Sequence, residues 1–117
     1  MMNSNRLCYA CDLKDDPKLI AEYKKYHKSI WPEIQQSIVD AGILNMEIYL
    51  CENRLFMIMD VAEHFDSEIK QKMDNDNPKV QEWENLMWNY QQALPKADKN
   101  EKWILLECIF RLGYKVL

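Results

Sequence analysis

The spacing of apolar residues changes at Gly42, and this change constrains the fold more than any other feature of the chain. Before Gly42, apolar residues recur about every 3.6 positions, as they do on one side of an α-helix. After it, apolar and polar residues alternate over residues 43–50, which is the period of a β-strand. Glu52-Asn53 then predicts a turn, and residues 54–61 return as a second strand. We therefore expect a helix that is followed directly by a β-hairpin.

Further strands and helices are expected on both sides of this unit. Pro17, Pro32 and Pro78 each suit the first turn of a helix, where a missing N–H costs no hydrogen bond. The expected strands are residues 7–13, 43–50, 54–61 and 102–112, and the expected helices are residues 17–30, 32–41, 65–73 and 78–94. This order predicts a ferredoxin-like α+β fold, in which a four-stranded antiparallel sheet has its helices on one face.

A single domain is expected to account for residues 1–117, with an ordered core at about residues 6–112 and a tail at residues 113–117. The formal charge of −4, with scattered lysines, does not fit a nucleic-acid surface. No apolar run approaches the ~20 residues of a membrane-spanning helix. The first residues have no apolar segment of a secretory signal. We therefore expect a cytoplasmic protein with no nucleic-acid or membrane partner.

The predicted strand at residues 54–61 has apolar side chains on both of its faces. Leu55 and Met59 point to one face, and Phe56 and Ile58 point to the other. A sheet with one face open to water would alternate apolar and polar residues instead. The simplest cover for the second face is the same sheet of another copy, so we expect a homodimer with a barrel-like core. Cover by the chain's own loops is the alternative, although so short a chain has few loop residues to supply.

Four cysteines occur, and two of them form the motif Cys8-x-x-Cys11. This spacing is found in redox and zinc sites, but here it falls in a predicted strand, where residues three apart point to opposite faces. No second cysteine pair and no paired histidines at ligand spacing accompany it. We expect buried free thiols in a reducing compartment and no metal site.

Tyr23 and His27 are the first candidates for chemistry. They are four residues apart on a predicted helix, so their side chains share one face. An imidazole can accept and release a proton near neutral pH, and a phenol can orient or relay one. A histidine on an apolar helix face is more often structural than catalytic, so its position alone leaves both interpretations open.

The chain is rich in aromatic residues, with four tryptophans and six tyrosines. Most of them are expected in the core, but an indole can also stack on the C–H face of a sugar, and Trp83 is the best candidate for this role. Glu47 and Glu107 are carboxylates in predicted strands, and Glu107 either pairs with Arg111 or contacts a ligand. Glycine-rich phosphate loops and metal-ligand clusters are absent from the sequence, so any chemistry is expected to need no cofactor.

A motif at residues 23–34 points to a known family. The sequence Tyr-Lys-Lys-Tyr-His-Lys-Ser-Ile-Trp-Pro-Glu-Ile resembles the L-rhamnose mutarotase family, whose signature is Tyr-x-x-x-His followed by Ile-Trp-Pro-Glu. The resemblance covers nearly the whole chain. Its other matching segments are Ala41-Gly42, Asn45-x-x-Ile48-Tyr49-Leu50, Leu55-Phe56, Trp83-x-x-x-Met87 and Leu106-Glu107-x-Ile109-Phe110.

The resemblance implies a dimeric ferredoxin-like barrel that interconverts the α and β anomers of a 6-deoxyhexose without a cofactor. It implies that His27 transfers protons, that Tyr23 contacts the substrate and that Trp83 forms part of the sugar-stacking wall. Two positions depart from the family pattern. Met46 stands where better-known members have a second substrate tyrosine, and Glu84 stands where they have a second tryptophan. These departures make L-fucose a serious alternative to L-rhamnose.

Tyr49 and Glu107 complete the expected substrate contacts, beside Met46 and Glu84. Mutarotation needs an acid and a base, and His27 can supply one of them. The other role falls to Tyr23, Glu107 or a bound water, and the sequence does not choose among them. Two other functions are compatible with the fold: a haem-handling or cofactor-free monooxygenase, and a non-catalytic sugar-binding module.

Overall fold

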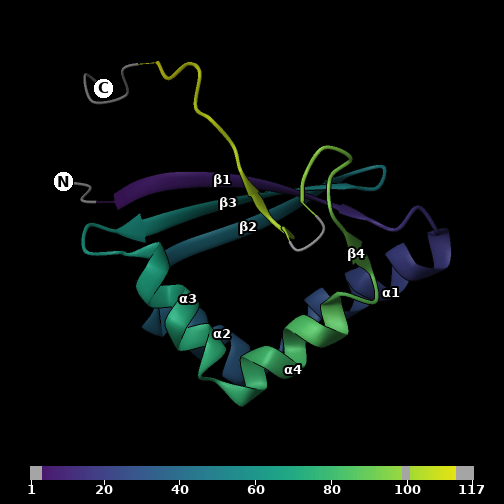
Figure 1. Cartoon of the computed structure of the whole chain (residues 1–117), viewed down its shortest axis with the longest axis horizontal. Helices are drawn as coiled ribbons and strands as arrows, with labels where there is room; N and C mark the ends of the chain where they lie inside the picture. The colour runs from purple at the N-terminus through teal and green to yellow at the C-terminus, as the bar shows by residue number, and fades with distance from the viewer. Residues whose placement is uncertain (1–3, 99–100, 113–117) are drawn as a thin grey trace.

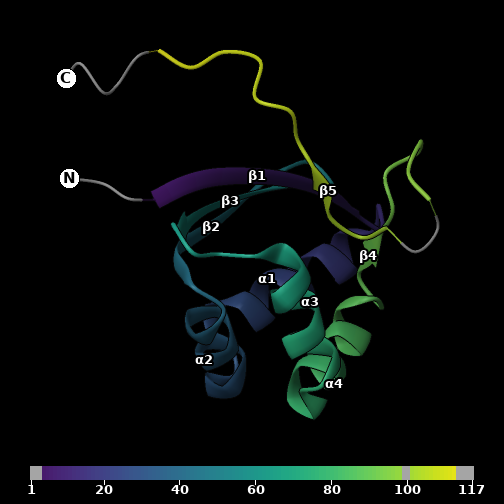
Figure 2. The ribbon, with the colours of Figure 1, turned by 60° about the vertical axis from the view of Figure 1, so that its left-hand side comes forward.

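The computed structural model describes residues 4–98 and 101–112, and the expected tail at residues 113–117 lies outside them. One antiparallel sheet has four helices packed against one of its faces (Figures 1 and 2). The elements in chain order are β1 (Ser4–Leu13), α1 (Pro17–Lys28), α2 (Pro32–Asp40), β2 (Ile43–Cys51), β3 (Arg54–Ala62), α3 (Ser67–Asn75), α4 (Pro78–Met87), β4 (Gln91–Gln92) and β5 (Ile104–Leu105).

The sheet has the strand order β2-β3-β1-β4, and β5 also pairs with β1. The first strand is therefore central, and the hairpin β2–β3 lies on one side of it, as Figure 1 shows. This arrangement confirms the ferredoxin-like α+β prediction. The expected fourth strand is replaced by two short strands, β4 and β5, of two residues each.

Local sequence explains where the helices begin and end. Asp16, Asp66 and Asn77 cap α1, α3 and α4, because each side chain accepts hydrogen bonds from two backbone N–H groups of the first turn. A proline occupies the first turn of α1, α2 and α4, as predicted. Gly42 has a φ of +91° after α2, a conformation that glycine adopts without strain, and it turns the chain into β2.

The core lies between the sheet and the helices. Leu13 and Leu55 are almost fully buried on the sheet side. Against them pack Tyr23 from α1 and Trp83 from α4. A second buried cluster, of Ile43, Met59 and Val61, lies further along the sheet. A bulge between Ile43 and Asn45 places Ile43 in this core and leaves Leu44 exposed.

The face of the sheet away from the helices is apolar in its middle. Strand register places Cys8 beside Ile58 and Ala10 beside Phe56 on this face. Tyr49 of β2 is the other neighbour of Phe56, and both rings are exposed. The prediction that β3 has two apolar faces is therefore confirmed.

The predicted strand at residues 102–112 is wrong for most of its length. Only Ile104–Leu105 pairs with β1, and the N–H of Leu106 makes the last bond, at 2.8 Å to the carbonyl oxygen of Cys8. The chain then runs away from the sheet (Figure 1), and Ile109 and Phe110 are 89% and 77% exposed. Alternation shows that a segment can pair as a strand, but β1 supplies no partner for residues 107–112.

The prediction that the last helix extends to residue 94 is also wrong. Helix α4 ends at Met87, and Trp88 is its C-cap residue. The following residues turn, and Gln91–Gln92 pairs with Asp12 and Leu13 on the edge of β1. Tyr90 and Leu94 keep the apolar spacing of a helix, although they lie beyond its end. Backbone groups at the edge of β1 pair with residues 91–92, and this pairing replaces further turns of the helix.

The four cysteines are free, as predicted, but they are not all buried. Cys11 is completely buried on the helix side and Cys8 is half-buried on the opposite face, so the two thiols diverge as expected. Cys51 and Cys108 are exposed, because one lies at the hairpin end and the other in the C-terminal segment. Within residues 4–98 and 101–112, no helix has the length and apolar character needed to cross a membrane.

Candidate active site

A cluster of aromatic rings lies between α1 and α4. Its members are Tyr23, Tyr26, His27, Trp31, Trp83 and Tyr90. Helix α1 contributes the first three, Trp31 comes from the connection to α2, and the last two come from α4 and the turn that follows it. The break between α1 and α2 places Trp31 against α4, where its ring centroid lies 5.1 Å from that of Trp83. The cluster therefore depends on the contact between these helices.

Tyr23 and His27 share one face of α1, as predicted, with ring centroids 4.2 Å apart. The imidazole Nδ1 of His27 lies 2.9 Å from the backbone carbonyl oxygen of Tyr23. A carbonyl oxygen can only accept a hydrogen bond, so this contact places a hydrogen on Nδ1. In the neutral ring Nε2 then has a free lone pair, which is the form that a general base needs.

Burial lowers the pKa of His27, and the hydrogen bond to the Tyr23 carbonyl opposes this effect in part. The lower pKa keeps the imidazole neutral at physiological pH, because a cation is less stable away from water. His27 is therefore available to accept a proton.

Trp83 is buried and forms one wall of the cluster. Its ring lies 5.6 Å from the imidazole of His27 and 6.3 Å from the ring of Tyr26, measured between centroids. Both contacts are edge-to-face, an arrangement that is favourable for aromatic pairs. The indole of Trp83 and the imidazole of His27 are thus fixed relative to each other.

The phenol of Tyr23 is held by a residue that the sequence did not single out. Nε2 of Gln91, in β4, donates a hydrogen bond of 3.1 Å to the Tyr23 hydroxyl oxygen. Burial raises the pKa of Tyr23 well above its ordinary value, so the hydroxyl keeps its hydrogen. Gln91 was missed because the helical pattern was expected to continue through it.

A second hydrogen bond joins α1 to the turn after α4. The hydroxyl of Tyr90 donates to Oε1 of Glu22 over 3.0 Å. Burial, together with this carboxylate, raises the pKa of Tyr90 to about 12.

An open cavity of about 490 Å³ lies on the same side of α1, and Tyr26 and Trp31 belong to both this cavity and the aromatic cluster. Its lining residues are Glu22, Lys25, Tyr26, Ser29 and Trp31.

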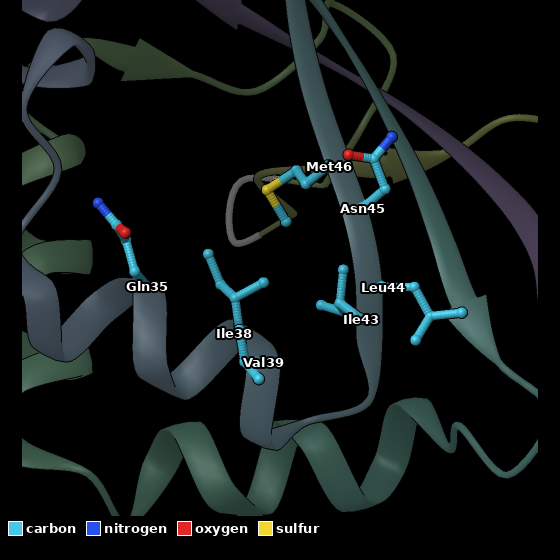
Figure 3. A pocket seen from close by; sticks show the side chains of 7 residues that line it. All are labelled: Gln35, Ile38, Val39, Ile43, Leu44, Asn45 and Met46. Atoms are coloured by element: carbon cyan, nitrogen blue, oxygen red, sulfur yellow. The ribbon is translucent and has the colours of Figure 1, made fainter.

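Another cavity, of about 240 Å³, lies between α2 and β2 (Figure 3). In Figure 3 the side chains of Gln35 and Ile38 from α2 lie on the same side of β2 as Met46. This cavity is smaller than the roughly 300–1,000 Å³ of most ligand pockets, whereas the cavity beside Trp31 falls within that range. By size, the cavity beside Trp31 is the better candidate for a sugar, and it adjoins the aromatic cluster through Tyr26 and Trp31, whereas His27, Tyr23 and Trp83 are not among its lining residues.

Met46 and Glu84 lie on the same side of the sheet as the aromatic cluster. Met46 pairs with Met59 of the second core cluster and is half-buried. Glu84 follows Trp83 on α4 and is also half-buried. Met46 lines the smaller cavity between α2 and β2, and neither residue lines the cavity beside Trp31.

Tyr49 and Glu107 are not brought to the aromatic cluster. Tyr49 points to the face away from the helices, where its hydroxyl donates to Glu47 over 3.0 Å. Glu107 is exposed in the segment that leaves the sheet. No ion pair joins Glu107 to Arg111, although both lie in the described part of the chain. Alternation along β2 places Tyr49 on the face away from the helices, and Glu107 is exposed because β5 ends at Leu105.

Lys102 is a further polar residue that the sequence pattern did not indicate. It is half-buried, and its Nζ lies 5.1 Å from the centre of the Trp88 ring. Burial lowers the pKa of Lys102, while Glu84 and Cys11 act in the opposite direction. The sequence pattern does not distinguish a buried lysine in a predicted strand from a solvent-exposed one.

Among residues 4–98 and 101–112, no group of three or more His, Cys, Asp or Glu side chains could hold a metal ion.

The chain is similar in sequence to known sugar mutarotases. The family model for L-rhamnose mutarotase matches residues 6–112. The L-fucose mutarotase of Xanthomonas campestris is 43% identical over 98% of this chain and 94% of its own length. The L-rhamnose mutarotase of Jannaschia sp. is 29% identical over 89% of this chain and 96% of its own length.

The crystal structure of an L-rhamnose mutarotase from Formosa agariphila has a similar fold. It matches with a TM-score of 0.69 and 26% sequence identity, over 92% of this chain and 98% of the other. The likeness therefore extends over most of this chain and nearly all of the other.

Proposed function

Because this chain belongs to the L-rhamnose mutarotase family, we propose that it is an isomerase that interconverts the α and β anomers of a 6-deoxyhexose, with L-fucose as its preferred sugar. The main support from the site is His27, whose Nδ1 is occupied by the Tyr23 carbonyl and whose neutral ring leaves Nε2 free. The rings of Tyr23 and Trp83 both pack against that imidazole.

The reaction begins with ring opening. Nε2 of His27 removes the proton of the anomeric hydroxyl as the hydroxyl of Tyr23 gives its hydrogen to the ring oxygen. The bond between C1 and the ring oxygen breaks, and an aldehyde forms at C1. After the C1 group rotates, both proton transfers run in reverse and the ring closes as the other anomer. Acid–base help of this kind contributes roughly a hundred- to ten-thousandfold in rate.

Tyr23 is the better partner for His27 among the groups that the sequence left open. Its ring packs against the imidazole at a tilt of 33°, whereas Glu107 lies in the exposed C-terminal segment. A phenol that keeps its hydrogen can act as the acid in the opening step and regains that hydrogen on closure.

The preference for L-fucose rests on relatives and on two residues. The L-fucose mutarotase of Xanthomonas campestris shares 43% identity with this chain, against 29% for the L-rhamnose mutarotase of Jannaschia sp.. Met46 and Glu84 replace a tyrosine and a tryptophan of the family pattern on the helix side of the sheet. A carboxylate offers a hydroxyl group an acceptor that an indole lacks, so it changes which sugar hydroxyls are bound.

We further propose that the enzyme is a cytoplasmic homodimer. The exposed rings of Tyr49 and Phe56 lie on the sheet face away from the helices, and Ile109 and Phe110 extend beyond it. A second copy would bury both groups through one symmetric contact. Four free thiols, two of them exposed, suit a reducing compartment.

Anomer exchange provides the test of function. Saturation of the H1 signal of one anomer should transfer to the other when the protein is present, strongly for L-fucose, more weakly for L-rhamnose and little for D-glucose. A stronger effect on L-rhamnose would overturn the preference for L-fucose. Absence of exchange with both 6-deoxy sugars would refute the mutarotase function.

Light scattering tests the assembly. The measured mass should be about twice that of one chain at micromolar concentration, and Phe56→Glu should shift it towards one chain, because a carboxylate in an apolar contact is costly. A wild-type protein with the mass of one chain would exclude the homodimer.

A further inference from the structure

Gln91 occupies an unusual position beside the proposed acid. Its side chain is among the most buried polar groups of the described residues, with 3% of the residue exposed. The backbone is fixed because β4 pairs with Asp12 and Leu13 of β1. Nε2 reaches across to α1 and donates to the hydroxyl of Tyr23 over 3.1 Å.

Oε1 of Gln91 is buried and makes no hydrogen bond within the described part of the chain. A buried acceptor without a partner is costly, and a leucine of similar size would avoid that cost. A purely structural side chain at this position gains little from being an amide. The polar group is therefore explained by what it does to Tyr23.

The direction of the hydrogen bond decides what Tyr23 can do. A phenol oxygen has one hydrogen to donate and can accept from others. Because Gln91 donates to that oxygen, the Tyr23 hydrogen stays available for a different acceptor. A carbonyl or carboxylate in the same place would instead take up the hydrogen.

We propose that Gln91 is a positioning residue for mutarotation: its Nε2 holds the Tyr23 oxygen so that the phenol hydrogen is directed at the ring oxygen of the sugar. This inference rests on the proposed function. The hydrogen bond also favours the phenolate that exists briefly when Tyr23 has given up its hydrogen, since a donor to the oxygen stabilises its charged form.

A double-mutant cycle separates positioning from structural support. Gln91→Leu should lower kcat for L-fucose about tenfold, the size expected for one hydrogen bond, with little change in KM. In a Tyr23→Phe background the same change should have almost no further effect on kcat, because the hydroxyl it positions is gone. If the loss of kcat in the double variant equals the product of the losses in Gln91→Leu and Tyr23→Phe, the two residues act independently and the proposal is overturned.

Gln91→Glu gives a second readout. The protonated acid can still donate to Tyr23, but the carboxylate can only accept, so activity should fall as pH rises through the pKa of the new acid, a limb that the wild type lacks. The titratable groups facing this position are Tyr23 of α1 and Cys11 of β1, with Lys102 beyond Cys11. Burial raises the pKa of Tyr23 and Cys11 and lowers that of Lys102, and a limb from any of these three groups would appear in the wild type as well.

Gln92→Leu is the matched control, because Gln92 is the next residue of β4 and is exposed. It should leave kcat, KM and the thermal midpoint unchanged. Circular dichroism and the thermal midpoint of each variant establish that the fold is retained.

A spectroscopic measurement keeps the inference testable apart from activity. With ¹³C-labelled tyrosine, the Cζ signal of Tyr23, identified by its loss in Tyr23→Phe, should shift in Gln91→Leu and not in Gln92→Leu. If that signal does not move, the hydrogen bond is absent and the proposal fails, whatever the sugar. If the wild type exchanges no anomers but the signal moves, the proposed function fails instead and Gln91 is left with no reaction to position.

Discussion

His27 is locked in one tautomer by the backbone of Tyr23, one turn before it on α1. The Nδ1 atom lies 2.9 Å from that carbonyl oxygen, so the helix itself decides that Nε2 is the basic nitrogen. The same turn stacks the Tyr23 ring on the imidazole, with 4.2 Å between centroids. One helical segment thus supplies both proposed proton-transfer groups and fixes the orientation of the base.

Replacement of His27 should stop catalysis without unfolding the protein. His27→Gln introduces a polar amide of similar length that does not accept and release protons near neutral pH. Anomer exchange should therefore fall by about a hundred- to ten-thousandfold. Saturation-difference NMR measures the loss, and circular dichroism should be unchanged. His64→Ala is the control, since His64 is exposed near the end of β3. Full activity in His27→Gln would show that the base is another residue.

The rate should have its acid limb below the ordinary histidine range. Burial lowers the pKa of His27 from its ordinary 6.5, and the base must be neutral to act. As pH falls, the exchange rate should therefore decline with a midpoint below 6.5. An acid limb above 6.5 in the wild type would contradict the burial of the imidazole.

The free energy of unfolding should also decrease as pH falls, because of the lowered pKa of His27. Folding favours neutral His27, so the unfolded chain binds the extra proton first as pH falls. This histidine therefore contributes stability that is present above pH 6.5 and is lost as the pH drops towards its folded value. His27→Gln should lose less stability on acidification than the wild type, as measured by urea unfolding at two pH values.

Trp83 should affect both stability and sugar affinity. Trp83→Phe removes part of a buried ring that contacts His27 and Trp31, and it should cost about 2 kcal/mol of unfolding free energy. KM for L-fucose should rise more than kcat falls, because a stacking surface binds the sugar in the ground and transition states alike. Trp88→Phe at the C-cap of α4 is the comparison, since Trp88 is half-buried and outside the cluster. An unchanged KM in Trp83→Phe would remove Trp83 from the sugar wall.

The two departures from the family pattern should control sugar preference. Met46→Tyr combined with Glu84→Trp restores the family residues on β2 and α4, and should raise the ratio of kcat/KM for L-rhamnose to that for L-fucose about tenfold. The variant and the wild type are compared with both sugars by the NMR exchange assay. A ratio that stays constant would place the determinants of preference elsewhere.

Thiol chemistry should leave the activity intact. Burial raises the pKa of Cys11 to about 12, so it should resist alkylation, whereas Cys51 and Cys108 should react in the native protein. Mass spectrometry after brief iodoacetamide treatment identifies the modified residues, and the exchange rate should be unchanged. Inactivation that follows modification of Cys11 would contradict its burial.

Most of the fold could be predicted from hydrophobic period and from capping residues. The strands β1 to β3 and the helices α1 to α4 occur where alternation, proline and Gly42 indicated, because these signals act within a few neighbouring residues. The C-terminal strand was wrong beyond Leu105, since strand formation needs a partner with free backbone groups. The extent of β4 likewise depends on the edge of β1 and has no local signal.

The site could be predicted only where its residues lie on one helix. The spacing of Tyr23 and His27 places them together on any α-helix, and Trp83 followed from its own helical stripe. Gln91 could not be found this way, because it reaches Tyr23 through a contact between residues 68 positions apart. The position of Tyr49 could not be predicted for a similar reason. Alternation along a strand shows which residues share a face of the sheet, but it does not show which face the helices cover.

The segment Ile30-Trp31-Pro32-Glu33 is the most distinctive part of the sequence, yet its role here is mechanical. Pro32 starts α2, and Trp31 turns back to contact Trp83 across the helix interface. The segment therefore joins α1 to α2 and contacts α4, and neither of the two proposed proton-transfer groups, Tyr23 and His27, lies within it.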